Sequence, residues 1–98
     1  LQYIVKEGIS SPANIAVQGG SNGALTTAVL MQRAPHLFRC SVLQSGLFDM
    51  LRFASHTIGP IWQAEYGNPQ LEEVRKVLKS YSPYYCSLNP EPEAAIVW

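Results

Sequence analysis

The first half of the chain alternates short apolar runs with one apolar helix, and this order most restricts its fold. Residues 15–17 are an apolar run of the length of a buried strand, and residues 40–43 predict a second short strand. Residues 24–32 between them are mostly small or aliphatic, which predicts a helix buried over most of its surface; Ala34-Pro35 ends it. A crossover of this length predicts parallel strands in a sheet covered on both faces. Two strands cannot form such a sheet alone, so we expect further strands from residues this chain does not contain.

A glycine-rich turn joins the first strand to the helix. Residues 19–23 read Gly-Gly-Ser-Asn-Gly and match G-x-S-x-G, in which the serine hydroxyl projects from a sharp strand-to-helix turn. Glycines two residues either side of the serine remove Cβ atoms that would crowd this turn. The following helix aims its N-terminal amides at developing negative charge, so the N–H of Asn22 is suited to hold an oxyanion. The pattern predicts Ser21 as the nucleophile of an α/β-hydrolase-type serine hydrolase.

Two other interpretations of this turn stay open. A G-x-S-x-G match is common by chance, and a glycine-rich strand-to-helix turn can lack any catalytic role. A phosphate-binding loop is the second, although the chain has neither a P-loop lysine nor the G-x-G-x-x-G spacing here. The strand before the turn, the helix after it and the second strand beyond that helix favour the nucleophile.

Composition argues against several classes of function. Seven basic and seven acidic residues give a formal net charge of zero, and no basic run offers a footprint for nucleic acid. No run approaches the roughly 18–20 apolar residues of a membrane span. The start lacks the basic-then-apolar order of a signal peptide. We therefore expect no nucleic-acid partner, no membrane partner, no metal and no cofactor.

The two cysteines bear on the cellular compartment, and the length and composition bear on whether the chain is part of a larger protein. Nothing in their spacing pairs Cys40 with Cys86, so we expect free thiols in a reducing compartment, the cytoplasm. The 98 residues are 47% hydrophobic and only 14% charged, and they lack an initiator Met. This balance predicts a globular segment cut from the interior of something larger.

The remaining segments give weaker signals. Residues 1–7 predict a helix that stops at Gly8. Residues 47–67 are aromatic-rich and less regular. Asn68 is predicted to cap a helix over 70–79, with Pro69 at its first position. In that helix four apolar residues fall at helical spacing and Ser82-Pro83 closes it; they are Leu71, Val74, Val77 and Leu78. Residues 96–98 suggest the beginning of another strand.

The Gly-Gly-Ser-Asn-Gly motif and segments spread over roughly residues 1–85 resemble the prolyl oligopeptidase family of serine peptidases. The other matching segments are Lys6-Glu7-Gly8 with Ser11-Pro12, Arg33-Ala34-Pro35 with Leu37-Phe38, residues 48–51, Thr57-Ile58-Gly59 with Trp62, Tyr66-Gly67 and Tyr81-Ser82-Pro83. Asn22, Trp62 and Tyr66 favour the branch of the family that cleaves after proline.

The resemblance implies a partial α/β-hydrolase fold, a parallel sheet with flanking helices that contains only the segment around the nucleophile. Ser21 would attack the carbonyl after proline and form an acyl-enzyme, and the Asn22 amide would donate to the oxyanion. Trp62 would stack on the proline ring, and Tyr66 and Leu47 would line the same pocket. A compact, apolar ring without an N–H suits such a stacking aromatic.

The resemblance also implies partners. The substrates would be short proline-containing peptides. Residues 1–98 would form an incomplete peptidase catalytic domain, completed by the remaining hydrolase sheet and accompanied by a β-propeller that limits substrate length. The family's acid and histidine would lie beyond residue 98. The family usually has glycine where this chain has Ala24, so we expect a slightly more crowded turn.

Two polar residues, Asp49 and His56, could be mistaken for parts of a triad. Asp49 and His56 follow Ser21 in the α/β-hydrolase order, but His56 comes only seven residues after Asp49 instead of on a late loop. We expect Asp49 to order a turn, His56 to lie on the surface or a pocket edge, and His36 to lie in a solvated loop. On spacing alone Trp62 and Tyr66 would be core residues, and only the resemblance favours a pocket.

Two alternatives to the peptidase stay open. An esterase or lipase could share the serine turn, and it would hydrolyse acyl esters without a preference for proline. A catalytically incomplete fragment could instead bind partners through exposed sheet edges, because the resemblance leaves the acid and histidine outside the chain.

Overall fold

The computed structural model describes residues 1–56, 58–87 and 96–97. These residues form two compact units. The first contains residues 1–46 and the strand at 96–97, and the second contains residues 47–87. Each unit has its own elements and its own buried residues, and the two are described separately below.

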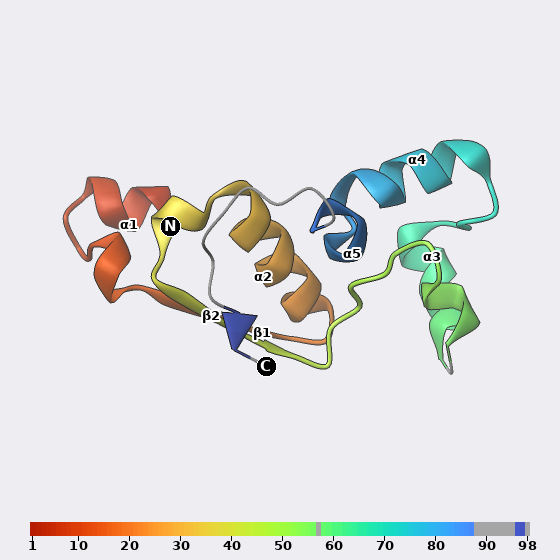
Figure 1. The fold of residues 1–98 in the computed structure, drawn as a ribbon, viewed down its shortest axis with the longest axis horizontal. Coiled ribbons are helices and arrows are strands. Elements are labelled where there is room, and N and C mark those ends of the chain that lie inside the picture. Colours follow the sequence, from red (N-terminus) through yellow and green to blue (C-terminus); the bar gives the residue numbers. More distant parts are fainter. Residues whose placement is uncertain (57, 88–95, 98) are drawn as a thin grey trace. The chain divides into compact units, whose positions relative to one another are not determined.

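The first unit contains a parallel sheet with strand order β1-β2-β3. Ala16 lies beside Cys40 and Gly20 beside Gln44, while Ser41 lies beside Ile96. Figure 1 shows α2 running over β1 and β2 as the crossover between them. The elements are α1 (Gln2–Lys6), a 3₁₀ turn (Pro12–Asn14), β1 (Ala16–Gly20), α2 (Asn22–Arg33), a second 3₁₀ turn (Pro35–Leu37), β2 (Cys40–Gln44) and β3 (Ile96–Val97).

These elements confirm the predicted strand, helix and strand order and the parallel pairing. α1 ends before Gly8, which has φ +67° as expected of a helix stop. Residues 96–97 form the expected further strand, while Trp98 lies outside the described residues. Gly19 and Gly20 belong to β1 and not to a loop, so the turn is shorter than its glycine content suggests.

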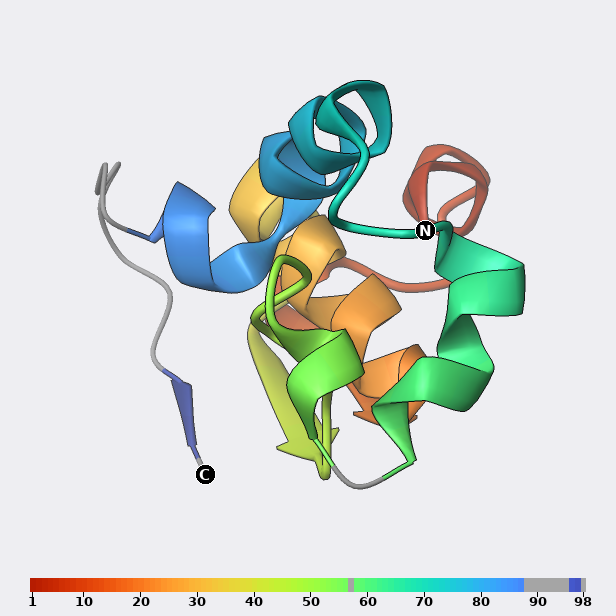
Figure 2. The same ribbon diagram turned by 90° about the vertical axis from the view of Figure 1, so that its right-hand side faces the viewer.

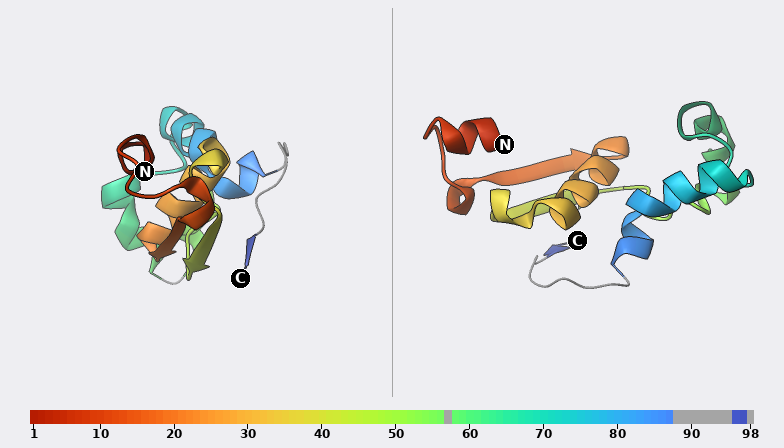
Figure 3. Two further views of the ribbon diagram at one scale, coloured as in Figure 1. Left: turned by 90° about the vertical axis from the view of Figure 1, so that its left-hand side faces the viewer. Right: turned by 90° about the horizontal axis from the view of Figure 1, so that it is seen from above.

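One face of the sheet packs against α2. Ala24, Leu25, Ala28 and Met31 of α2 are buried, and Leu43 of β2 is buried with them. The Ser41 hydroxyl, on the same face of β2, donates to the Met31 sulfur at 3.4 Å. The left view of Figure 3 shows the two strands lying together beneath this helix.

The other face of the sheet is exposed in the described part of the first unit. Alternate residues of β2 point to it, and Val42 among them is 41% exposed. The neighbouring positions in β1 are exposed as well; the exposed residues of this face are Ala16, Gln18, Gly20, Cys40, Val42 and Gln44. A sheet covered on both faces was predicted, and the described residues provide one cover only, because they contain a single crossover helix.

The second unit is built from short helical turns and one longer helix, as the irregular sequence of residues 47–67 suggests. Its buried side chains include Met50, Leu51, Phe53 and Leu78. Figure 2 shows the chain bending sharply where α4 gives way to α5. The elements are 3₁₀ turns at Phe53–Ser55 and Gly59–Trp62, followed by α3 (Gln63–Tyr66), α4 (Glu72–Tyr81) and α5 (Pro83–Cys86).

The predicted start of α4 at Asn68-Pro69 is wrong. The helix begins at Glu72, and Leu71, with extended backbone, is its N-cap. The Asn68 side chain accepts a hydrogen bond from the N–H of Gln70 (2.9 Å), and its backbone carbonyl accepts one from the N–H of Leu71 (3.1 Å). Asn68 therefore closes a separate turn before the helix, because its side chain competes for the backbone donors of the next residues.

The apolar stripe of α4 is only partly covered. Leu78 is 1% exposed, whereas Val77 is 61% exposed and Leu71 is exposed too. Val74 is half-buried. The opposite, charged face is solvated as expected, with one long Glu72–Lys76 ion pair at 3.6 Å; its exposed residues are Glu72, Glu73, Arg75, Lys76 and Lys79.

Candidate active site

Ser21 is the single residue between the end of β1 and the beginning of α2. Its backbone has φ +52° and ψ −120°, a combination that non-glycine residues adopt rarely and at a cost of about 1–3 kcal/mol. Neighbours hold it there from both sides: its N–H donates to the Gln44 carbonyl (2.9 Å), and its carbonyl accepts from the N–H of Ala24 (3.0 Å) and of Leu25 (3.3 Å). Hydrogen bonds to both the sheet and the helix therefore stabilise the strained conformation.

The Ser21 hydroxyl differs from that of an ordinary helix-capping serine. A capping serine has extended backbone and its side chain accepts a hydrogen bond from the second or third helical N–H. Ser21 occupies the N-cap position of α2 with neither the extended backbone nor a side-chain cap hydrogen bond, and the residue is exposed. The turn thus presents a serine oxygen to solvent at the end of a strand.

Gly19 is required for this turn to close. A Cβ at Gly19 would overlap the Gly23 carbonyl and would lie 2.6 Å from the Thr27 Oγ1 atom. A Cβ at Gly23, in contrast, would meet nothing within 4 Å. The expected crowding is therefore found on the strand side of Ser21 and not on the helix side. Ala24, where glycine was expected from the resemblance, is fully buried, so its methyl group packs inside the unit.

Asn22 is the first residue of α2, a helix of 12 residues. Backbone N–H groups of a first helical turn point out of the helix end, which carries partial positive charge. The Asn22 carbonyl accepts a hydrogen bond from the Thr26 hydroxyl at 3.2 Å, which fixes the first turn. The N–H of Asn22 and the Ser21 hydroxyl thus lie at the same helix end, an arrangement suited to an oxyanion on a group attached to Ser21.

Trp62, Tyr66 and Leu47, the predicted pocket residues, belong to the second unit. The 3₁₀ turn Gly59–Trp62 runs directly into α3, so Trp62 and Tyr66 lie one turn apart on a continuous helical segment. Both are half-buried, as is Leu47 at the beginning of the unit. The Tyr66 ring packs edge-to-face on Phe53, with centroids 5.5 Å apart and an interplanar angle of 72°.

Two tyrosines of this unit are held in the neutral form. Burial raises the pKa of Tyr66, and the nearby Glu65 carboxylate and Tyr81 raise it further. The pKa of Tyr81 is raised by burial first and by Glu65 second. Both phenols therefore stay protonated over a wider pH range than a free tyrosine.

The hydrogen-bond partners of the Asp49 carboxylate belong to its own turn. Its carboxylate accepts hydrogen bonds from the Arg52 guanidinium, as an ion pair, and from the N–H of Leu51 at 3.2 Å. Asp49 thus orders a turn, as expected, and His56 is exposed on the surface. His36 is also exposed, and it follows the C-terminal end of α2. At 1.5 Å per residue, the 12-residue helix separates that end from Ser21 by about 18 Å.

Two residues of interest were missed by sequence reasoning. Ser82 is 0% exposed and its hydroxyl bonds two backbone groups of residues 48–50, more than 30 positions earlier. Ser45, directly after β2, has φ +50°. The sequence indicates Ser82 only as part of the Ser82-Pro83 helix end and of a segment that carries the resemblance, because no local pattern reveals so distant a contact. A positive φ at a serine likewise leaves no signature in the sequence.

The described residues contain two free thiols, and they contain neither a metal site nor a membrane-spanning helix. Among residues 1–56, 58–87 and 96–97, no three His, Cys, Asp or Glu side chains gather as a metal site. Cys40 is exposed, Cys86 is half-buried, and both are free thiols. No helix in the same stretch is long and apolar enough to cross a bilayer.

Comparison with known proteins identifies relatives over most of the chain. Prolyl endopeptidase from Dictyostelium discoideum is 42% identical over 82 residues, which are 84% of this chain and 11% of that protein. Prolyl oligopeptidase ophP from Omphalotus olearius is 38% identical over 84 residues, 86% of this chain and 11% of that protein. The chain therefore spans about a tenth of the length of these relatives.

Solved structures agree with the sequence relatives. A post-proline cleaving enzyme from Rickettsia typhi superposes with a TM-score of 0.82 at 32% identity, covering 86% of this chain and 12% of that one. A prolyl endopeptidase structure gives a TM-score of 0.83 at 36% identity with the same coverage. These neighbours confirm the partial α/β-hydrolase fold. The sequence model of the prolyl oligopeptidase family matches residues 1–96, and the chain belongs to that family.

Proposed function

We propose that Ser21 is the nucleophile of a serine peptidase that cleaves short peptides after proline. The observation that carries this proposal is the backbone of Ser21, a strained non-glycine residue fixed between β1 and α2 with an exposed side chain that does not cap the helix. Strain of this kind persists where surrounding structure over-determines it, and it gathers at functional sites. Membership of the prolyl oligopeptidase family supports the same chemistry.

The reaction would proceed through an acyl-enzyme. The Ser21 oxygen attacks the carbonyl carbon of the scissile bond while a base accepts its proton, and the negative charge collects on the carbonyl oxygen. The N–H of Asn22, at the positive end of α2, donates to that oxygen. Collapse releases the amine portion with a proton and leaves an ester on Ser21, which water then hydrolyses. The base and its acid would come from residues outside this chain.

The preference for proline would come from Trp62, Tyr66 and Leu47. Trp62 offers a half-buried indole face, and the neutral Tyr66 lies one helical turn away. A proline ring is compact, apolar and without an N–H, so it gains from aromatic stacking and requires no hydrogen-bond acceptor. The printed names of the relatives, prolyl endopeptidase and post-proline cleaving enzyme, support the same preference. These aromatics favour a peptidase over an ester hydrolase of the same fold.

We also propose that residues 1–98 are part of one larger catalytic domain. The open face of the three-stranded sheet and the 11–12% coverage of the relatives support a longer protein, called the complete enzyme below. By the same resemblance, that enzyme would carry a β-propeller that restricts substrates to short peptides. Free Cys40 and Cys86 support a reducing, cytoplasmic location.

The nucleophile is tested by labelling the complete enzyme with a fluorophosphonate probe and locating the label by peptide mass spectrometry. The label is expected on Ser21, and Ser21→Ala should abolish it together with turnover of a proline-linked reporter. Ser45→Ala is the matched control, since Ser45 is also exposed and has a positive φ. Ser45 should not react with the probe, so this variant should keep both the label on Ser21 and the turnover. Label on a different serine would sink the assignment, and equal turnover of simple acyl esters without proline preference would favour the esterase.

A further inference from the structure

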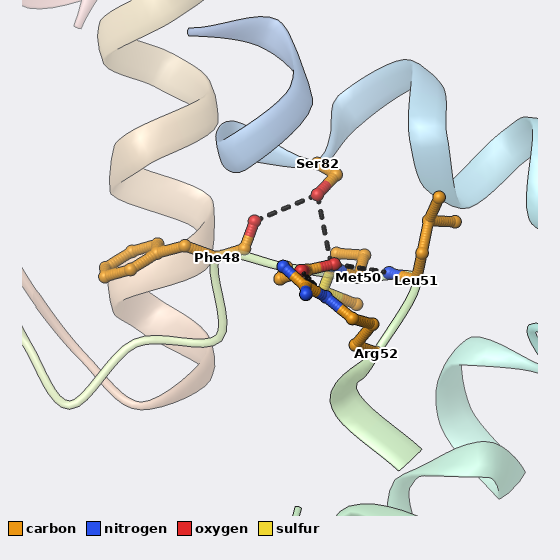
Figure 4. A network of polar contacts seen from close by, with 6 residues as sticks. Phe48, Met50, Leu51, Arg52 and Ser82 are labelled. Atoms are coloured by element: carbon orange, nitrogen blue, oxygen red, sulfur yellow. Dashed lines mark hydrogen bonds and ion pairs between the residues drawn. The ribbon is translucent and has the colours of Figure 1, made fainter. Parts of the chain in front are cut away.

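A buried hydroxyl ties two distant segments of the second unit together. Ser82, at the end of α4, is 0% exposed. Its hydroxyl donates to the Phe48 carbonyl at 2.9 Å and accepts from the N–H of Met50 at 3.0 Å (Figure 4). A single side chain 32 to 34 positions away thus satisfies both backbone groups.

The backbone at residues 48–50 needs such a partner. The carbonyl of one residue and the N–H of the residue two further on face the same way along an extended chain, and here both are directed at Ser82. No strand of the described second unit lies beside them. Since buried backbone groups are rarely left unpaired, the hydroxyl takes the place of a neighbouring strand for the N–H of Met50, and it shares the Phe48 carbonyl with the N–H of Tyr84.

Further contacts hold the same segment from the same side. The N–H of Tyr84 also donates to the Phe48 carbonyl, at 2.9 Å. The Arg52 guanidinium, paired with Asp49, lies 5.4 Å from the centre of the Tyr84 ring. Residues 48–52 are thus joined to the junction of α4 and α5 by hydrogen bonds and a cation–π contact, while the Arg52–Asp49 ion pair lies within the segment itself. Ser82 is the one fully buried polar side chain among these contacts.

This fastened segment leads in both directions to residues of the proposed pocket. Leu47 directly precedes Phe48 in the chain. Phe53 follows at the other end, is fully buried, and forms the ring on which Tyr66 packs. A shift of the 48–50 backbone would therefore move Leu47 directly and Tyr66 through Phe53.

We propose that Ser82 is a positioning residue for proline specificity: its hydroxyl fixes the 48–50 backbone and thereby sets the spacing between Leu47 and the Trp62–Tyr66 segment. The proposal rests on the function proposed above, because it assigns these three residues to the pocket that receives the proline ring. Ser82 contacts no substrate in this scheme and acts only through the backbone that it holds.

The test compares two reporters in the complete enzyme that differ only in proline or alanine before the scissile bond. Ser82→Ala is expected to lower the proline-to-alanine ratio of kcat/KM about tenfold, mainly through a higher KM for the proline reporter. Ser80→Ala is the matched control, because the Ser80 hydroxyl is exposed and bonds only the Val77 carbonyl of its own helix. It should keep the ratio of the unchanged enzyme.

The ratio does not depend on how much enzyme is folded, so partial misfolding of the variant does not obscure the result. Should Ser82→Ala yield no active enzyme, Ser82→Cys, close in volume but a weaker hydrogen-bonding partner, provides the same comparison. A ratio that stays unchanged in these variants overturns the positioning role. Absence of any proline preference in the unchanged enzyme would instead overturn the proposed function, and the two failures are thereby distinguished.

Discussion

At the scale of single residues, the glycines near Ser21 differ sharply in how much space surrounds them. Gly19 lies against the Gly23 carbonyl and the Thr27 side chain, with no room for a Cβ. Gly20, the next residue, has its nearest such neighbour, the Gln44 carbonyl, at 4.0 Å. The G-x-S-x-G pattern identified the serine from sequence, but it assigned the crowding equally to both flanking glycines. Only the folded backbone distinguishes Gly19 from Gly23.

Gly19→Ala should therefore destabilise the turn, whereas Gly20→Ala should be tolerated. Because the new Cβ overlaps backbone and not a flexible side chain, we expect a loss of roughly 1–3 kcal/mol, as for other overpacked sites. Slower labelling of Ser21 by a fluorophosphonate should accompany it. Thermal unfolding and labelling rates of the complete enzyme measure both effects. Equal behaviour of the two variants would contradict the close approach at Gly19.

At the scale of elements, the order of strands and helices was predictable, and the ends and burial of α4 were not. Short, mainly apolar segments located β1 and β2, and a run of small and aliphatic residues located α2 between them. Helical spacing also grouped Val77 and Leu78 on one apolar face of α4, although one is exposed and the other buried. Asn68 was misread as the helix cap, since its turn chemistry resembles that of a cap. The spacing of apolar residues indicates which of them share a helix face, but it does not indicate whether other residues bury that face.

Val77 and Leu78 provide a matched pair for this difference. Leu78→Ala should cost about 2–5 kcal/mol, since it removes a fully buried side chain from the core of the second unit. Val77→Ala should cost less than about 0.5 kcal/mol if its exposed side chain has no partner in the complete enzyme. Chemical denaturation of the complete enzyme measures both. A large loss for Val77→Ala would instead reveal that another part of that enzyme covers this face of α4.

At the scale of the whole molecule, the chain contains the proposed nucleophile and the proposed pocket in two separate compact units. Ser21 could be proposed as the nucleophile from sequence because its motif is local. The pocket was not predictable from spacing, which favoured core residues for Trp62 and Tyr66, and only the resemblance assigned them a role. We propose that the base lies outside this chain: within the first unit His36 follows the end of α2 opposite Ser21, and within the second unit Asp49 is paired with Arg52.

The isolated 98-residue chain is therefore expected to show no proline-specific cleavage, because an unactivated serine hydroxyl is a weak nucleophile. Release of fluorophore from a proline-linked reporter checks this, with the Ser21→Ala chain as the background. Turnover that disappears in the Ser21→Ala chain would contradict the expectation and would show that a base lies within these residues.

The positive φ of Ser21 opposes the stability of the protein to the proposed role of this side chain as a nucleophile. A glycine at this position would adopt the same backbone without the steric penalty of a Cβ. The variant without the hydroxyl is therefore expected to be the more stable protein. Selection for stability alone would drive this position towards glycine. Under the proposed role of Ser21, a laboratory search for heat-resistant forms of the complete enzyme is expected to recover inactive Ser21→Gly variants, which an assay for cleavage would identify.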